Sequence, residues 1–414
     1  MKIGIVTHGI PNLFSEGTTK EAIILIEELK KRNISTKLFI QNYTKIFASS
    51  SSKDKLFKSI KNYEYKIIQE KNTSLLQKII KNCSRLFSRN PDNFFTDHIT
   101  RKKIESLIYK YNPDLIINML NIPCSSNYGL KYIPTYNYIN MPPHEVEKLR
   151  FEIYKKDFRF QNFFLMLNSL IYYKNIHKTY KKVFKNTRIG FLASPDSFNY
   201  YKKILKGKKL ITLKNFTKNQ NQKYFPYTKK KKVIIMVGNL KATFTKEGLY
   251  DLSENIMPYL LKLRKKINFK LYIIGKFDPP TSVKYLLKYD WIKFTGWVQD
   301  INKYYKIANC ILVTNPTPLG TRIRILNCMQ AGVPVVTYKS NVLNNKEFIY
   351  NKNILFANDP KSIVNELEKV LLNNKLGKRL SLAGYKTIKK HYNYKKIANF
   401  MIDTILKDYK SINN

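Results

Sequence analysis

The chain has 414 residues, 43% of them hydrophobic and 25% charged, and its formal net charge at pH 7 is +47. This composition is typical of a folded globular protein with room for two domains, and it argues against a fibrous repeat or extended disorder. The longest apolar stretch, residues 163–173, contains Asn168 and Ser169 and is shorter than the roughly 20 apolar residues that cross a bilayer, so no transmembrane helix is expected.

The positive charge has three explanations. Lysine is spread over the whole chain together with abundant Asn, Ile and Tyr, so a bias toward AT-rich codons accounts for much of the excess. The remainder favours attraction to an anionic membrane surface, where each basic residue contributes about 1 kcal/mol. Nucleic-acid binding ranks third, because no zinc-finger or RRM pattern is present, and no specific nucleic-acid partner is expected.

The N-terminus and the cysteines bear on the compartment. The first apolar run is interrupted by Gly4 and has no small-residue cleavage site behind it, so we expect a cytoplasmic protein. Four cysteines lie far apart with no CxxC pair or histidine at metal-ligand spacing, which predicts free thiols and no metal site; they are Cys83, Cys124, Cys310 and Cys328.

In chain order, the first forty residues predict the start of a parallel sheet. A buried strand at 3–6 precedes a helix that Thr18 or Thr19 can cap, and a second strand follows at 37–40. The lysine-rich region 49–101 is expected to hold helices and loops. Later apolar runs predict strands at 115–117, 136–139, 189–192 and 210–213.

Residues 215–232 lose the apolar periodicity and predict a solvated linker. Strands and helices then alternate, which is the pattern of a doubly wound α/β sheet. The predicted strands are 233–237, 269–274, 292–294, 310–313 and 333–337, and the predicted helices are 248–266, 301–308, 322–331, 361–372, 376–391 and an amphipathic stretch at 395–409.

The loop after the strand at 310–313 is the most informative segment. Pro316 and Pro318 exclude regular structure, Gly320 permits an unusual backbone, and Thr321 can cap the next helix. A loop of this kind at the carboxyl end of a parallel strand presents N–H groups and a helix N-terminus to an anion.

Three side chains extend this predicted anion site. Arg322 adds a fixed positive charge, and Arg324 and Asn327 lie three residues apart on one face of the predicted helix. The pair could therefore reach other parts of a bound nucleotide.

Residues 320–336, GTRIRILNCMQAGVPVV, resemble the donor-site segment of the large retaining glycosyltransferase family that includes sucrose synthases and bacterial mannosyltransferases, the glycosyl transferases group 1. VGNL at 237–240, IIG at 273–275 and FTGWV at 294–298 follow the family's order and spacing. The likeness covers about 233–391, and in the N-terminal half only residues 4–17 and the strand pattern agree.

The resemblance implies a GT-B fold, in which two Rossmann-like, doubly wound domains face a central cleft. The expected boundaries are an acceptor-side domain at 1–214, a linker at 215–232, a nucleotide-sugar-binding domain at 233–392, and a C-terminal helix at 393–414 that can pack back on the first domain. A nucleotide sugar would be the co-substrate, with no other cofactor. No metal would be needed, and no Asp-x-Asp motif occurs in the sequence.

The resemblance also implies a set of donor-binding residues. Protein cations and loop amides would stabilise the charge of the leaving diphosphate, and a glycine after the first strand would let the N-terminal domain approach the donor. These residues are Gly17, Lys241, Lys246, Gly320, Thr321, Arg322, Arg324 and Asn327.

Several positions depart from the family pattern. Two glutamates usually lie near the transferred sugar and the ribose, and Leu319 and Asn327 occupy those positions here. Asn327 can still hydrogen-bond a ribose, whereas Leu319 has only its backbone to offer. A catalytically degenerate GT-B scaffold or carbohydrate-binding subunit therefore stays as an alternative.

The family's arginine–lysine pair for the diphosphate is also changed. Asn239 and Glu247 stand at these positions, and Lys241 and Lys246 are the expected substitutes.

Three residues are candidates for the reacting centre. Asn140 lies where the family often has a histidine, His144 follows closely, and Glu347 lies where a carboxylate tends to contact the donor. A loop role for His144 and a surface role for Glu347 are the alternatives.

The sequence thus predicts a retaining glycosyltransferase that acts on a glycan or glycolipid acceptor in surface polysaccharide or lipopolysaccharide synthesis. The basic aromatic segment 158–173 allows a peripheral contact with an anionic membrane at the inner face of the cell membrane, or a helix packed on a core.

Overall fold

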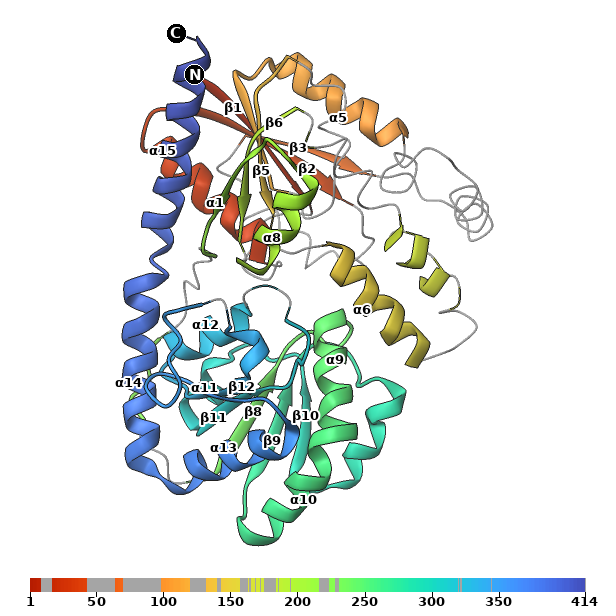
Figure 1. Ribbon diagram of the computed structural model, residues 1–414, viewed down its shortest axis with the longest axis vertical. Coiled ribbons are helices and arrows are strands. Elements are labelled where there is room, and N and C mark those ends of the chain that lie inside the picture. Colours follow the sequence, from red (N-terminus) through yellow and green to blue (C-terminus); the bar gives the residue numbers. More distant parts are fainter. Residues whose placement is uncertain are drawn as a thin grey trace. The chain divides into compact units, whose positions relative to one another are not determined.

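The computed structural model describes residues 1–8, 17–42, 64–69, 98–119, 132–139, 143–156, isolated positions between 163 and 184, 186–193, 195–215, 223–227, and 231–413 without 319, 321 and 344. The chain forms two compact units. The first comprises Met1–Phe151, Arg159–Lys218 and Tyr394–Asn414, and the second comprises Glu152–Phe158 and Asn219–Asn393. Each unit contains one parallel sheet (Figure 1).

The sheet of the first unit has seven strands in the order β3-β2-β1-β4-β5-β6-β7. Residues of β1 alternate between two cores, as expected of a strand covered on both faces. Ile3 and Ile5 pack with α1 and α15, and Val6 packs with α5. The strands are β1 (Lys2–His8), β2 (Ser35–Asn42), β3 (Tyr65–Gln69), β4 (Leu115–Asn118), β5 (Thr135–Ile139), β6 (Thr187–Leu192) and β7 (Lys209–Thr212), and the helices are α1 (Gly17–Lys30), α5 (His98–Tyr111), α6 (Pro143–Lys156), α8 (Pro195–Ile204) and α15 (Tyr394–Asn413).

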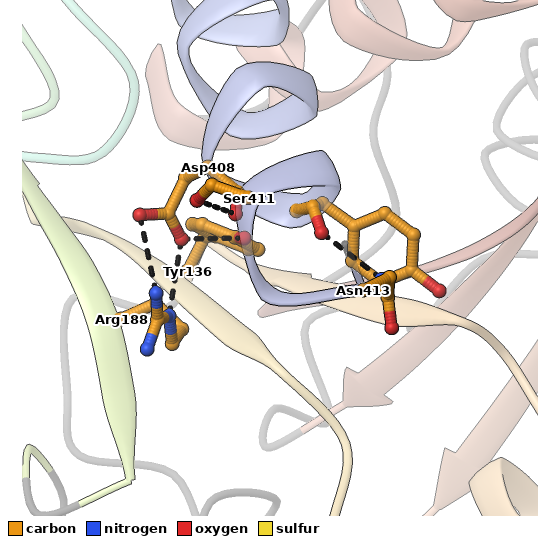
Figure 2. A network of polar contacts seen from close by, with 6 residues as sticks. Tyr136, Arg188, Asp408, Ser411 and Asn413 are labelled. Atoms are coloured by element: carbon orange, nitrogen blue, oxygen red, sulfur yellow. Dashed lines mark hydrogen bonds and ion pairs between the residues drawn. The ribbon is translucent and has the colours of Figure 1, made fainter.

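The C-terminal helix α15 packs beside α1 on the sheet of the first unit (Figure 1). Its apolar stripe is buried there and includes Met401 and Ile405. Near its end, Asp408 accepts hydrogen bonds from the Tyr136 hydroxyl at 2.9 Å and from Arg188 Nε at 3.1 Å (Figure 2). Polar contacts with β5 and β6 therefore fix the last turns of this helix.

We expect Asp408→Ala to lower the free energy of unfolding by about 1–3 kcal/mol, because it leaves the buried Tyr136 hydroxyl without its acceptor. The measurement is urea denaturation followed by circular dichroism. Asp403→Ala on the same helix is the matched control, since its ion pair with Arg32 is exposed and should contribute less than about 1 kcal/mol. Equal losses in the two variants would contradict an anchoring role for Asp408.

The sheet of the second unit has six strands in the order β10-β9-β8-β11-β12-β13, which is the Rossmann order. The predicted fold class, two doubly wound α/β domains, is therefore confirmed. The strands are β8 (Val233–Val237), β9 (Lys270–Ile274), β10 (Ile292–Gly296), β11 (Cys310–Val313), β12 (Val335–Tyr338) and β13 (Leu355–Ala357), and the helices are α9 (Thr243–Asp251), α10 (Met257–Lys266), α11 (Asn302–Ile307), α12 (Ile323–Gln330), α13 (Pro360–Leu372) and α14 (Asn374–His391).

The predicted helix at 248–266 differs most from the structure. It begins five residues earlier, at Thr243, and a π-helical segment, Leu252–Ile256, separates α9 from α10. Gly248 lies inside this helix, where the close approach of Thr314 leaves no room for a side chain. A Cβ on Gly248 would lie 2.9 Å from Thr314 Oγ1. Pro258 follows the π segment and has no N–H to continue the regular ladder.

Two further predictions need correction. Region 49–101, expected to hold only helices and loops, contains the edge strand β3, whose two central isoleucines are surrounded by polar residues in sequence. The linker was predicted to be solvated, but its residues 223–227 belong to the second unit and pack within it. Tyr227 is buried, and the Phe225 N–H donates to the Ala331 carbonyl at 3.0 Å.

The remaining predictions concern membrane-spanning helices, the basic aromatic segment and the cysteines. Among the described residues, no helix combines the length and apolarity needed to span a bilayer. Half of segment 158–173 lies outside the described residues, as do Cys83 and Cys124, whereas Cys310 and Cys328 are buried free thiols.

Candidate functional site

The topology of the second unit singles out one place for a ligand. From β8 the chain proceeds through β9 to β10 on one side, and from β11 through β12 to β13 on the other. Ligands of doubly wound sheets bind where the loops after two such strands diverge at the carboxyl edge. Here these loops are 238–242 and 314–322, which include half of the donor-binding residues predicted from sequence, namely Lys241, Gly320, Thr321 and Arg322.

Loop 314–322 is tied to α9 by buried polar contacts. Glu247, which is 7% exposed, accepts hydrogen bonds from Asn315 Nδ2 and from the Thr317 N–H, both at 3.0 Å. The Thr314 hydroxyl donates to the Gly248 carbonyl at 2.6 Å. The carboxylate at the position where the resemblance implied a lysine therefore holds the loop in place.

Arg322 is buried within this loop, with 6% of its surface exposed. Its Nε donates to Asn341 Oδ1 at 2.8 Å and its Nη2 to the Thr317 carbonyl at 2.6 Å. The guanidinium lies 4.7 Å from the centroid of the Phe244 ring. Arg322 thus shapes the loop as well as giving it positive charge.

Two more residues determine the conformation of this loop: Gly320 from within it, and Asn341 from the segment after β12. Gly320 adopts φ +66°, an unusual backbone conformation of the kind that a glycine at this position was expected to permit. Asn341 donates through Nδ2 to the Asn315 carbonyl at 2.8 Å while its Oδ1 accepts from Arg322. Thr321, the predicted cap, lies outside the described residues, and α12 begins at Ile323 without a side-chain cap.

Arg324 faces the other diverging loop. Its Nη2 donates to Thr245 Oγ1 at 3.3 Å, and a Cβ on Gly238 would come within 3.3 Å of its Nη1. Burial lowers the pKa of this guanidinium. Asn327 follows one turn later on the same helix face and is partly buried. The structure thus brings α12 next to loop 238–242.

The two predicted substitute lysines occupy different settings. Lys241 is exposed, with its Nζ 4.1 Å from the centroid of the Phe277 ring, and its N–H donates to Asn239 Oδ1 at 3.0 Å. Lys246 lies within α9 and is partly buried.

Of the remaining candidates, His144 and Glu347 have local partners in their own units. In the first unit, the His144 ring stacks on Tyr200 with a centroid distance of 3.6 Å, and its Nε2 lies 3.1 Å from Glu145. In the second unit, burial and the neighbouring Glu347 carboxylate raise the pKa of Tyr392. Gly17 is the first residue of α1, and Asn140 lies outside the described residues.

The structure adds residues that the sequence did not single out. Glu247 and Asn341 hold the loop, and Phe277 adopts φ +78°, which is unusual for a residue other than glycine. A buried carboxylate next to an asparagine and a main-chain N–H gives no signal in sequence. Among the described residues, no cluster of His, Cys, Asp or Glu could hold a metal ion.

Comparison with known proteins finds one family model that matches part of the second unit. Residues 231–373 match the family model described as Glycosyl transferases group 1. No curated protein matches the chain.

Solved structures share the fold over nearly the full chain. Sucrose-phosphate synthase from Thermosynechococcus elongatus is 14% identical with a TM-score of 0.69, and 99% of each chain is covered. TarM from S. aureus, in complex with UDP and alpha-GlcNAc-glycerol, is 14% identical with a TM-score of 0.65 and 99% coverage of each chain. Anabaena HepE, in complex with UDP and glucose, is 11% identical with a TM-score of 0.62, covering 98% of this chain and 100% of that one.

Proposed function

We propose that this chain, whose residues 231–373 match the model of the glycosyl transferases group 1, transfers a sugar from a nucleotide-sugar donor to a hydroxyl of a glycan or glycolipid, with retention at the anomeric carbon. The observation that carries the proposal is the set of buried contacts that Thr317 and Arg322 make in loop 314–322, at the point where the chain paths from β8 and β11 diverge. This loop presents a positive-φ glycine and the N-terminus of α12 at the edge where such sheets bind nucleotides.

The roles of these residues follow from where negative charge develops during sugar transfer. As the sugar leaves, negative charge grows on the departing diphosphate, and donors fixed in advance stabilise it without reorganising. Lys241, Arg324 and the buried Arg322 would provide this positive field, so we propose that transfer needs no metal ion. The donor residues proposed from sequence also include Gly17, Lys246, Gly320, Thr321 and Asn327, and those near the reacting sugar are Asn140, His144 and Glu347.

A uridine nucleotide is the first donor to test. Solved structures of HepE hold UDP and glucose, and the pneumococcal O-GlcNAc transferase GtfA has been solved with UDP and GlcNAc. For the acceptor, we propose surface polysaccharide or glycolipid synthesis at the inner face of the cell membrane, where a net charge of +47 would favour anionic lipid.

The test is a thermal-shift panel with UDP, GDP, CMP, ADP and their common sugars, with magnesium and with EDTA. A ligand that binds only the folded protein stabilises it by about 2.7 kcal/mol at a concentration of 100 times Kd. We expect one base to raise the melting temperature equally under both conditions, and release of free sugar from the matching donor. Binding without any turnover would favour the degenerate scaffold, and no binding by any nucleotide would refute the proposal.

A further inference from the structure

A cluster of two lysines and one phenylalanine lies after β8 and β9. Lys241 Nζ and Lys276 Nζ approach the Phe277 ring, at 4.1 and 5.2 Å from its centroid. Phe277 holds its ring there from a backbone with φ +78°. That conformation costs a residue with a side chain about 1–3 kcal/mol and persists where the surroundings impose it, often at functional sites.

Close contacts join this lysine–phenylalanine cluster to the donor loops. The Leu240 N–H donates to the Lys276 carbonyl at 3.2 Å. Gly275, two residues before Phe277, packs so closely on Gly238 that a Cβ would come 1.7 Å from its carbonyl oxygen. Since a Cβ added to Gly238 would in turn lie 3.3 Å from Arg324 Nη1, the cluster lies at the same edge as the diverging loops.

The charges of the cluster are unbalanced. Among the residues that the structure describes, no carboxylate forms an ion pair with Lys241 or Lys276, although both ammonium groups approach the same ring. Two like charges held near each other repel, and ordering each lysine costs side-chain entropy. Cation–π attraction to the ring, about 0.5–1 kcal/mol per exposed pair, offsets part of this cost. An anion bound by both ammonium groups would offset the rest.

The two positions where the resemblance implied an arginine and a lysine carry no positive charge here. Asn239 accepts the Lys241 N–H, and Glu247 carries a negative charge that is used to hold loop 314–322.

We propose that Lys241 and Lys276 bind the diphosphate of the donor nucleotide, and that Phe277 is the positioning residue that holds both lysines toward it. The inference rests on the proposed function, because it assumes that a nucleoside diphosphate occupies this edge. The inference adds Lys276 and Phe277 to the donor site. It also gives a reason for a phenylalanine at a position whose backbone conformation favours glycine.

Titration calorimetry with UDP and UMP tests the assignment in the full-length chain. Lys276→Ala is expected to weaken UDP binding about tenfold and UMP binding less than threefold, because UMP lacks the second phosphate. Lys270→Ala is the matched control. It removes an exposed lysine from the opposite end of β9 and should leave both affinities unchanged.

Phe277→Gly separates positioning from folding. Glycine accepts a positive φ, so the melting temperature of the unliganded protein should stay the same or rise, while UDP binding weakens as in Lys276→Ala. Wild-type UDP affinity in both Lys276→Ala and Phe277→Gly would overturn this inference, and so would equal losses for UDP and UMP. Failure of the wild-type chain to bind UDP or any other nucleoside diphosphate would instead refute the proposed function.

Discussion

Arg322→Ala is expected to weaken nucleoside diphosphate binding at least about tenfold, and to lower the free energy of unfolding of the second unit by about 2–4 kcal/mol. The guanidinium is almost fully buried, and its removal leaves Asn341 Oδ1 and the Thr317 carbonyl without their donor. Loop 314–322 would then lose the contact that links its middle to its end. Titration calorimetry and urea denaturation measure the two effects.

Two further variants show how Arg322 acts. Arg379→Ala, on α14, removes an exposed arginine with a single hydrogen bond to Asn351 and should change neither measurement appreciably. Asn341 is 4% exposed and would act only through the loop, so Asn341→Ala tests whether loop shape is sufficient to explain the loss. If Arg322→Ala binds nucleotide as well as the wild-type chain, loop 314–322 is not the donor site.

Local patterns in the sequence were sufficient for most of the second unit. Buried strands flanked by glycine or proline, such as β8, were predicted at the observed residues. Gly320 was predicted to permit an unusual backbone, and it adopts a positive φ. Edge strands were harder to predict from sequence. The edge strand β13, for example, has only three residues, which is too short to show an alternation of apolar and polar side chains.

The polar contacts of the site could not be predicted in the same way. Glu247 is an ordinary glutamate in sequence, and only the approach of loop 314–322 to α9 makes it a buried acceptor. Phe277 gives no sign of its positive φ, because that conformation results from the packing of the chain after β9. The sequence therefore located the site through its backbone-forming residues, whereas the side-chain network depends on tertiary contacts between distant segments.

Gly275→Ala is expected to have the largest effect on folding. The added Cβ would lie 1.7 Å from the Gly238 carbonyl oxygen and 2.9 Å from its carbonyl carbon, and both are backbone atoms that cannot rotate away. The carboxyl ends of β8 and β9 would have to separate, which we expect to cost about 3 kcal/mol or more. Thermal or urea denaturation measures this loss.

Gly384→Ala on α14 provides the matched control in the same unit. Its Cβ would meet Met329 Cε at 3.3 Å, the flexible end of a long side chain, and alanine is favoured in a helix, so stability should change by less than about 1 kcal/mol. Because Gly238 also lies close to the Arg324 guanidinium, separating β8 from β9 in Gly275→Ala should weaken nucleotide binding together with stability. Wild-type stability in Gly275→Ala would mean that the two strand ends move apart freely. The lysine–phenylalanine cluster would then lose the rigid support on which its role in binding the diphosphate depends.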